Sequence, residues 1–231
     1  LIINGAMQVA QRGADNLNIT TASGGTFAAD RFKFFLSLGG TAQFDLQQVA
    51  EAPSGSGFTN SLKVSCDVTA TLTANHYLFL AYNIEGQDLQ HLKKGTDSAE
   101  SVTLSFHLRS NKTSSGSVML RDTNNNRMIG GTYTVSSANT WQKVTMTFAG
   151  DTVGAIDNDN LGGMRIEWHL DSGTTYSSGT VPTSWETRDN ADRNATNFGL
   201  VSSTDNYWQI TGVQLEIGEQ ATPFEHRPFG D

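Results

Sequence analysis

Residues 101–110, SVTLSFHLRS, decide the fold. Apolar side chains stand at every second position (Val102, Leu104, Phe106 and Leu108), and the positions between them are mostly polar. Successive side chains of a β-strand point to opposite faces, so this alternation predicts a strand with one buried face and one wet face. Such strands are typical of antiparallel sheets packed on a core.

The same alternation recurs on both sides of this stretch. The predicted inward sets are Phe32, Phe34, Leu36 and Leu38; Leu62, Val64, Cys66, Val68, Ala70 and Leu72; Val144, Met146 and Phe148; and Met164, Ile166, Trp168 and Leu170. Segments rich in Gly, Asn, Asp and Ser separate these strands, and residues 87–95 have a helical pattern. We predict an all-β, antiparallel, jelly-roll-like β-sandwich of about ten to twelve strands with one short helix, in a single domain, 1–231.

The last strand changes parity. Trp208 and Ile210 are even-numbered, Val213 and Leu215 are odd-numbered, and Gly212 stands at the switch. A β-bulge at the glycine would keep both apolar sets on the core.

The C-terminal residues, 219–231, are predicted to form an extended strap. Pro223 and Pro228 oppose regular strand pairing. Phe224 and Phe229 are predicted to dock the strap, either on the flank of the sandwich or on a neighbouring chain.

Residues 77–85 are apolar on both faces, which predicts a cover for the second face, that of Tyr77 and Phe79. This cover could come from a long loop, from the N-terminal segment or from a partner subunit. Cover from within the chain is favoured, because residues 1–13 and the tail both need a place to lie.

Composition excludes several classes of protein. The formal net charge of −8 argues against nucleic-acid binding, which needs a basic footprint. The single cysteine, Cys66, excludes an internal disulfide and a cysteine-based zinc site, and its inward parity indicates a buried small side chain. The longest apolar runs are too short to insert into a membrane. The first residue is Leu1, so we expect an excerpt of a longer chain.

Two aromatic residues are candidates for sugar stacking. Trp185 lies in a polar loop, and Tyr176 lies in the preceding loop as its companion. Core or anchoring roles are favoured for Trp141, Trp168 and Trp208.

A second candidate is the row Arg165, Glu167, His169 and Asp171 on the polar face of one strand. Such a row can bind a polar ligand across a concave sheet. A solvated face with cross-strand ion pairs is the more ordinary interpretation.

Asp157 and Asp159 are weak candidates for a structural calcium ion, since carboxylates in a loop suit that cation. The spacing fails as a calcium loop because Trp168 stands where a bidentate Glu is required, and a plain turn is favoured. We expect no other cofactor.

Several motifs together carry a family resemblance: LIINGAMQVAQRG (1–13), NIEG (83–86), TWQKVTMTF (140–148), and TGVQLEIG followed by ATPFEHR (211–227). The sequence resembles a recurrent module of bacteriophage tail-fibre and virion structural proteins over nearly its whole length. Such modules are similar in pattern to the jelly-roll carbohydrate-binding modules of secreted glycosidases. The resemblance implies no catalytic residues.

The resemblance implies a phage virion structural protein (tail fibre, tail tip or head decoration) that serves assembly and attachment to the host surface, with weak multivalent glycan contacts. Its expected partners are other virion proteins, further copies of itself in a trimer, and a host-surface glycan. We expect it in the virion, after assembly in the host cytoplasm, and not as an enzyme. The alternative is a carbohydrate-binding module of a secreted polysaccharide-degrading enzyme. A third alternative is a capsule depolymerase domain. The acids Glu186, Asp189 and Asp192 cluster in one loop, but the sequence singles out no pair of them for glycoside hydrolysis.

Overall fold

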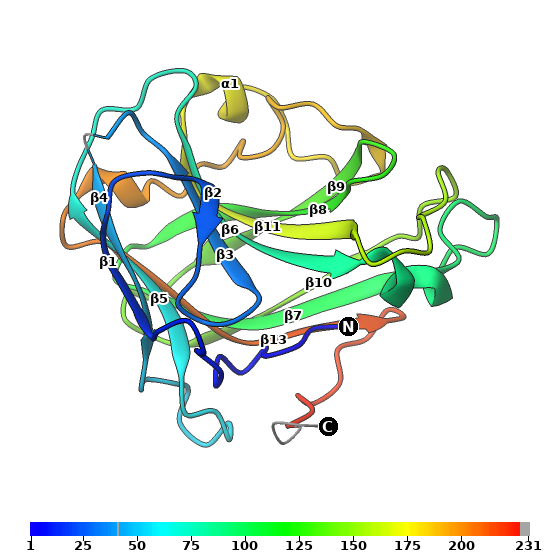
Figure 1. The fold of residues 1–231 in the computed structure, drawn as a ribbon, viewed down its shortest axis with the longest axis horizontal. Helices are drawn as coiled ribbons and strands as arrows, with labels where there is room; N and C mark the ends of the chain where they lie inside the picture. Colours follow the sequence, from blue (N-terminus) through cyan, green and yellow to red (C-terminus); the bar gives the residue numbers. More distant parts are fainter. Residues whose placement is uncertain (41, 227–231) are drawn as a thin grey trace.

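A computed structural model describes residues 1–40 and 42–226, and it shows two antiparallel sheets facing each other across one core (Figure 1). The six-stranded sheet has the order β1 (Asp15–Ile19), β4 (Gln43–Val49), β5 (Ser61–Val68), β13 (Tyr207–Ile217), β7 (Val102–Ser110) and β10 (Gln142–Phe148). The seven-stranded sheet has the order β12 (Glu186–Thr187), β9 (Arg127–Val135), β8 (Ser114–Asp122), β11 (Gly162–Ser172), β6 (Tyr77–Glu85), β3 (Phe32–Ser37) and β2 (Ala22–Thr26).

The predicted all-β sandwich is confirmed, with thirteen strands in the described part of the chain. The count exceeds the predicted number because short edge strands such as β2 (ASGGT) and β12 (ET) carry no apolar alternation. No helix of the described chain has the length and apolar character needed to cross a membrane.

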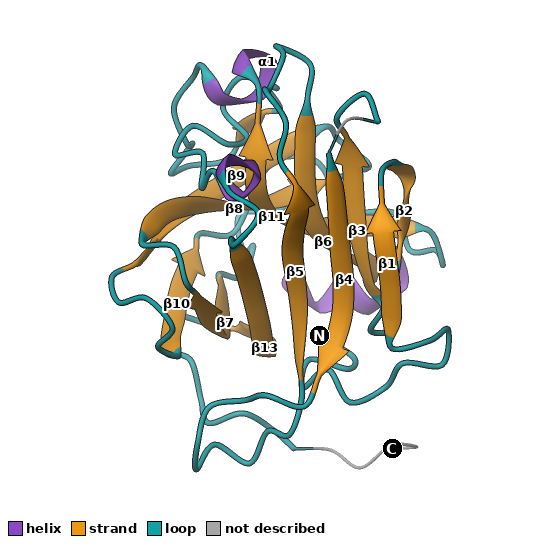
Figure 2. Cartoon of the chain, turned by 90° about the vertical axis from the view of Figure 1, so that its left-hand side faces the viewer, coloured by secondary structure: helices purple, strands orange, loops and turns teal. Residues whose placement is uncertain are grey.

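The helical elements are short. Residues 87–95 were predicted to be helical, and the 3₁₀ helix η1 (Gly86–Leu92) lies there with Leu89 and Leu92 buried. A second 3₁₀ helix, η2 (Leu200–Ser202), precedes β13. Helix α1 (Thr174–Ser177) follows β11 in a loop without periodicity, and it lies at one end of the sandwich in both views (Figures 1 and 2).

The core follows the alternation of the sequence. Phe106, Ile166, Trp168 and Trp208 are completely buried between the sheets. Val144 and Met146, both predicted to be inward, are half-buried because β10 is an edge strand, covered by β7 on one side. Three further predicted inward residues differ, because β5 ends at Val68: that residue is exposed, and Ala70 and Leu72 are half-buried.

The predicted bulge at Gly212 is confirmed. The register between β13 and β7 shifts between Thr211 and Gln214, and Gly212 has a φ of 61°. A Cβ on this residue would lie 2.5 Å from Cζ of Phe58. The left-handed backbone and this contact both require glycine, so the strand bends here while both apolar sets face the core.

Both ends of the described chain lie against β13. The N-terminal segment runs along this strand, and Val213 donates its N–H to the carbonyl of Gly5 at 3.0 Å (Figure 1). In the tail, Glu225 donates its N–H to Oε1 of Gln214 at 3.0 Å, and the ring of Phe224 packs on Phe58 of the same chain. Phe229 lies outside the described residues.

A buried ion cluster stabilises the end of the sandwich near η1. The Lys94 ammonium lies 2.5 Å from Oδ2 of Asp122 and 2.9 Å from Oδ2 of Asp151, and it donates to the carbonyls of Val153 and Gly154. Its side chain is 4% exposed. Two carboxylates and two carbonyls are oxygen ligands that suit a calcium ion, and here they surround an ammonium group instead.

Arg127 completes this cluster with an ion pair of 2.7 Å to Asp151. Burial alone would raise the pKa of Asp151, but Arg127 and Lys94 hold it below its ordinary value. Two cations and two carboxylates thus balance each other.

Replacing Lys94 by Met is expected to lower the free energy of unfolding by about 3–5 kcal/mol, because the buried Asp122 loses its cation and Asp151 keeps only Arg127. Urea denaturation measures the change. The control is Lys93→Met, whose exposed ammonium pairs with Glu100, and it should change stability by less than about 1 kcal/mol. Equal effects of the two substitutions would contradict the structural role of Lys94.

Candidate functional site

The outer face of the seven-stranded sheet carries charged and polar side chains that are almost completely buried. Arg165, Glu167 and His169 of β11 point away from the core, since the even-numbered residues between them are completely buried. Cross-strand pairing sets Arg165 between Asn83 of β6 and Arg121 of β8. Glu167 and His169 are 1% exposed, so this face is not simply solvated.

Residues 173–199, which we call the covering loop, fold over this face. The carbonyl of Arg193 accepts a hydrogen bond from the hydroxyl of Ser117 at 3.0 Å. Asn194 donates from its side chain to Oγ of Ser172 and from its backbone to the carbonyl of Tyr176. These bonds tie the loop to β8, to β11 and to itself.

Glu167 is the centre of an ion cluster. Its Oε2 lies 2.9 Å from Nη2 of Arg193 and 3.1 Å from Nε2 of His169. Its Oε1 lies 3.5 Å from Arg165 and 3.7 Å from Arg121. Burial alone would raise the pKa of Glu167, but Arg193, His169 and Arg165 hold it well below 4.5, so the carboxylate is ionised.

His169 is neutral in this environment. Burial lowers its pKa below 6.5, and the hydrogen bond with Glu167 offsets the shift only in part. Because Nε2 faces an ionised carboxylate, that nitrogen carries the proton, and Nδ1 is left without a partner among the described residues.

Aromatic rings flank the charges. Phe35 of β3 and Phe79 of β6 stack with ring centroids 4.9 Å apart, and Tyr77 meets Tyr176 edge-on at 5.5 Å. Phe35, Tyr77 and Tyr176 are half-buried. The guanidinium of Arg165 lies 5.3 Å from the centroid of Phe35. The site therefore combines ring faces with fixed hydrogen-bond donors, the combination that ligand pockets use for affinity and orientation.

The predicted cover for Tyr77 and Phe79 comes from within the chain. The covering loop contributes it, with Tyr176 against Tyr77 and Arg193 over the Phe79 ring at 5.4 Å. The N-terminal segment and the tail, the segments expected there, lie along β13 of the other sheet instead. They go there because the bulged outer side of β13 offers them backbone and side-chain partners.

Asp171 was predicted to lie in one row with Arg165, Glu167 and His169, but its role differs from theirs. The register shifts between His169 and Asp171, and the carboxylate accepts N–H groups of Val201 and Ser172. Burial raises the pKa of Asp171 to about 6 in spite of these bonds. Asp171 therefore anchors the start of η2.

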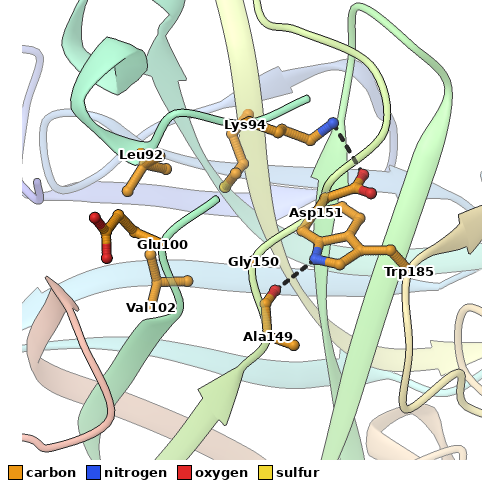
Figure 3. A pocket seen from close by; sticks show the side chains of 9 residues that line it. Leu92, Lys94, Glu100, Val102, Ala149, Gly150, Asp151 and Trp185 are labelled. Atoms are coloured by element: carbon orange, nitrogen blue, oxygen red, sulfur yellow. Dashed lines mark hydrogen bonds and ion pairs between the residues drawn. The ribbon is translucent and has the colours of Figure 1, made fainter. Parts of the chain in front are cut away.

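Trp185, predicted to be an exposed companion of Tyr176, is half-buried beside the ion cluster of Lys94 and Asp151 near η1 (Figure 3). Its indole N–H donates to the carbonyl of Ala149 at 2.7 Å, and the Lys94 ammonium lies 5.3 Å from its ring. Tyr176 contacts Tyr77 and Arg193 instead. Trp185 and Tyr176 therefore pack against different groups of residues.

The aspartates of the loop before β11 cap backbone and side-chain groups. Asp157 accepts from Nδ2 of Asn124, and Asp159 accepts from the N–H of Leu161. Within residues 1–40 and 42–226, no three His, Cys, Asp or Glu side chains gather to hold a metal ion. Both carboxylates therefore already have hydrogen-bond partners within the chain.

Sequence reasoning missed four residues of this face: Phe35, Arg121, Arg188 and Arg193. Phe35 and Arg121 are at the outward parity of β3 and β8, which the alternation already indicates. Arg188 and Arg193 lie in the covering loop, where no periodicity shows which way a side chain points.

Neither a family model nor a curated protein matches the sequence. Among solved structures, the chain is similar to a family 4 carbohydrate-binding module, with 12% identity, a TM-score of 0.47, and coverage of 94% of this chain and 100% of that one. It is similar to a family 11 carbohydrate-binding module from Clostridium thermocellum in complex with a mixed-linked tetrasaccharide, with 12% identity, a TM-score of 0.42, and coverage of 89% and 96%.

The enzymatically active domain of tailspike protein 4 from bacteriophage CBA120 is also similar, with 11% identity and a TM-score of 0.45. The match covers 87% of this chain and 21% of that one.

Replacing Glu167 by Gln is expected to lower the free energy of unfolding by about 3–5 kcal/mol, because three guanidinium groups lose their shared carboxylate. The folded-state pKa of Glu167 is depressed, so its stabilisation is present above pH 4.5 and is lost as the pH falls through the folded-state pKa. Urea titrations at a series of pH values should show the difference from wild type shrinking in acid.

The matched control is Glu85→Gln. Glu85 pairs with Arg31 at 3.5 Å and its side chain is 33% exposed, so the cost should stay below about 1 kcal/mol. A difference between wild type and Glu167→Gln that does not depend on pH would contradict the ionised state of the buried carboxylate.

Proposed function

We propose that this chain is a non-catalytic glycan-binding module that works through the outer face of its seven-stranded sheet. One observation carries the proposal: half-buried rings (Phe35, Tyr77 and Tyr176) stand beside guanidinium groups that are held in place by a buried carboxylate. Pyranose rings offer apolar faces for stacking and hydroxyl oxygens for donors, so such a surface suits them.

The donors of this face are fixed before a ligand arrives. Nε of Arg165 donates to Oδ1 of Asn83 at 2.8 Å, and the same guanidinium is held between Glu167 and the ring of Phe35. Arg193 is held between Glu167 and the rings of Phe79 and Tyr176. Side chains that are already ordered lose little conformational entropy on binding.

The acids near this face support binding rather than hydrolysis. A glycosidase needs a carboxylic acid that is protonated near neutral pH, together with a second, free carboxylate. Glu167 is held ionised by its cations. Burial raises the pKa of Asp171 to about 6, but this residue is 2% exposed and both of its oxygens accept backbone N–H groups, so it is not placed to protonate a sugar oxygen. The loop acids Asp189 and Asp192 likewise accept the N–H groups of Ala191 and Thr180.

Binding is expected to depend on the rings. Tyr176→Ala should weaken binding to a recognised glycan by roughly fivefold, equivalent to about 1 kcal/mol, because a stacking face is lost. Tyr207→Ala is the control, since Tyr207 is a half-buried tyrosine of the six-stranded sheet. Glycan-array screening identifies the ligand, and isothermal titration calorimetry measures both variants; an equal loss in both would contradict a site on this face.

For the biological setting, we propose a structural and attachment component of a bacteriophage particle, assembled as a trimer. The sequence motifs that resemble tail-fibre modules support this setting. A trimer would present three weak sites together and gain avidity without a deep pocket. A carbohydrate-binding module of a secreted polysaccharide-degrading enzyme would use the same face with a different neighbour in the chain.

Purified bacteriophage particles provide the test of the proposed virion setting. Mass spectrometry of purified virions should detect this chain, and light scattering of the isolated protein should give the mass of three copies. Its recovery instead as part of a secreted glycosidase would contradict the virion assignment and leave glycan binding intact.

A further inference from the structure

The ion cluster on the outer face of the seven-stranded sheet is unbalanced. Three arginines, Arg121, Arg165 and Arg193, share the single carboxylate of Glu167. In the described part of the chain, that carboxylate is the one within 4.0 Å of these guanidinium groups. The surplus of positive charge stands out in a chain whose formal net charge is −8.

A fourth arginine of the covering loop adds to the surplus. Arg188 donates to Oδ1 of Asn190, a neutral partner. Burial, Arg121 and Arg193 together lower the pKa of Arg188 to about 10. Burial also lowers the pKa of Arg121, and Arg165 and Arg193 add to that shift while Glu167 opposes it. These guanidinium groups therefore repel one another at partly desolvated positions, where a further anion would be stabilising.

Several donors of this cluster have no acceptor. The Nε atoms of Arg121, Arg188 and Arg193 are buried without a hydrogen-bond partner among the described residues. Arg193 is 6% exposed, so its Nε is also shielded from bulk water. Buried polar atoms are normally satisfied, so unpartnered ones gathered in one place indicate a ligand that supplies the missing groups.

The exposed parts of the same cluster leave room for an approaching group. The side chains of Arg121 and Arg165 are 24% and 23% exposed. Arg165 also lies over the ring of Phe35, so a group bound to this guanidinium would sit beside a stacking surface. Guanidinium groups form paired N–H···O bonds with planar carboxylates, which adds geometric selectivity to the charge attraction.

We propose that the glycan bound at this face is an acidic polysaccharide, and that a sugar carboxylate of the uronic-acid class binds to Arg121, Arg165 and Arg188 while the exposed parts of the Phe35 and Tyr176 rings contact the sugars. This inference rests on the proposed glycan-binding function and names its ligand class. Glu167 keeps the guanidinium groups in position, and the ligand carboxylate offsets their remaining charge.

The test compares acidic polymers with their own neutral forms. The full chain is titrated with polygalacturonate, alginate and hyaluronan, and with each polymer after its carboxyl groups have been reduced to alcohols. We expect at least one acidic polymer to bind about tenfold more tightly than its reduced form, with an affinity that falls as NaCl rises.

The outcomes separate the two proposals. Equal affinity for an acidic polymer and its reduced form would overturn the acidic ligand and leave glycan binding standing. Binding to neither form of any of the three polymers would overturn both.

Variants locate the contact. Arg165→Gln and Arg188→Gln should each weaken binding of the acidic polymer by about tenfold and leave binding of its reduced form almost unchanged. Arg109→Gln is the control. This substitution removes the same charge, but Arg109 belongs to β7 of the other sheet. Circular dichroism verifies folding of each variant; if one is unfolded, the comparison of polymers on the wild-type chain still decides. An equal loss in all three variants would show a general charge effect and overturn the assigned contact.

Discussion

Strand β11 is buried on both faces, and the rest of the structure depends on that double burial. Its even-numbered residues, including Trp168, fill the core between the sheets. Its odd-numbered residues Glu167 and His169 are polar and also buried, under the covering loop. Burying apolar side chains stabilises the sandwich directly, whereas burying a carboxylate is favourable only if cations and donors surround it. The sandwich therefore fixes the positions of Glu167 and His169, and the covering loop must supply cations and hydrogen-bond donors for them.

The two buried ion clusters in the described part of the chain show two ways of meeting this requirement. Near η1, Lys94 and Arg127 face Asp122 and Asp151, so the charges are equal in number and the cluster holds loops and strands together. On the outer face of the seven-stranded sheet, several guanidinium groups share one carboxylate. A balanced cluster is complete without a ligand, whereas an unbalanced one with unpartnered donors is ready to receive an anion.

The fold could be predicted in some detail from the sequence, because period-two burial is a local property. The inward position of Phe106 and Ile166 followed from alternation alone, and the bulge at Gly212 followed from a parity switch beside a glycine. Errors came where pairing partners decide burial. Met146 is half-buried because its strand lies at an edge, and an edge position depends on the whole sheet order.

The candidate site was accessible to sequence reasoning only in part. The sequence by itself determined the alternation, the parity of each strand residue and hence the row of Arg165, Glu167 and His169 on one outward face. Only the tertiary structure decided that the covering loop closes over this row, that Arg193 pairs with Glu167, and that the N-terminal segment lies on the other sheet. The physical reason is that a strand sets the direction of its side chains through its own backbone, whereas a loop is positioned by contacts between residues far apart in the sequence.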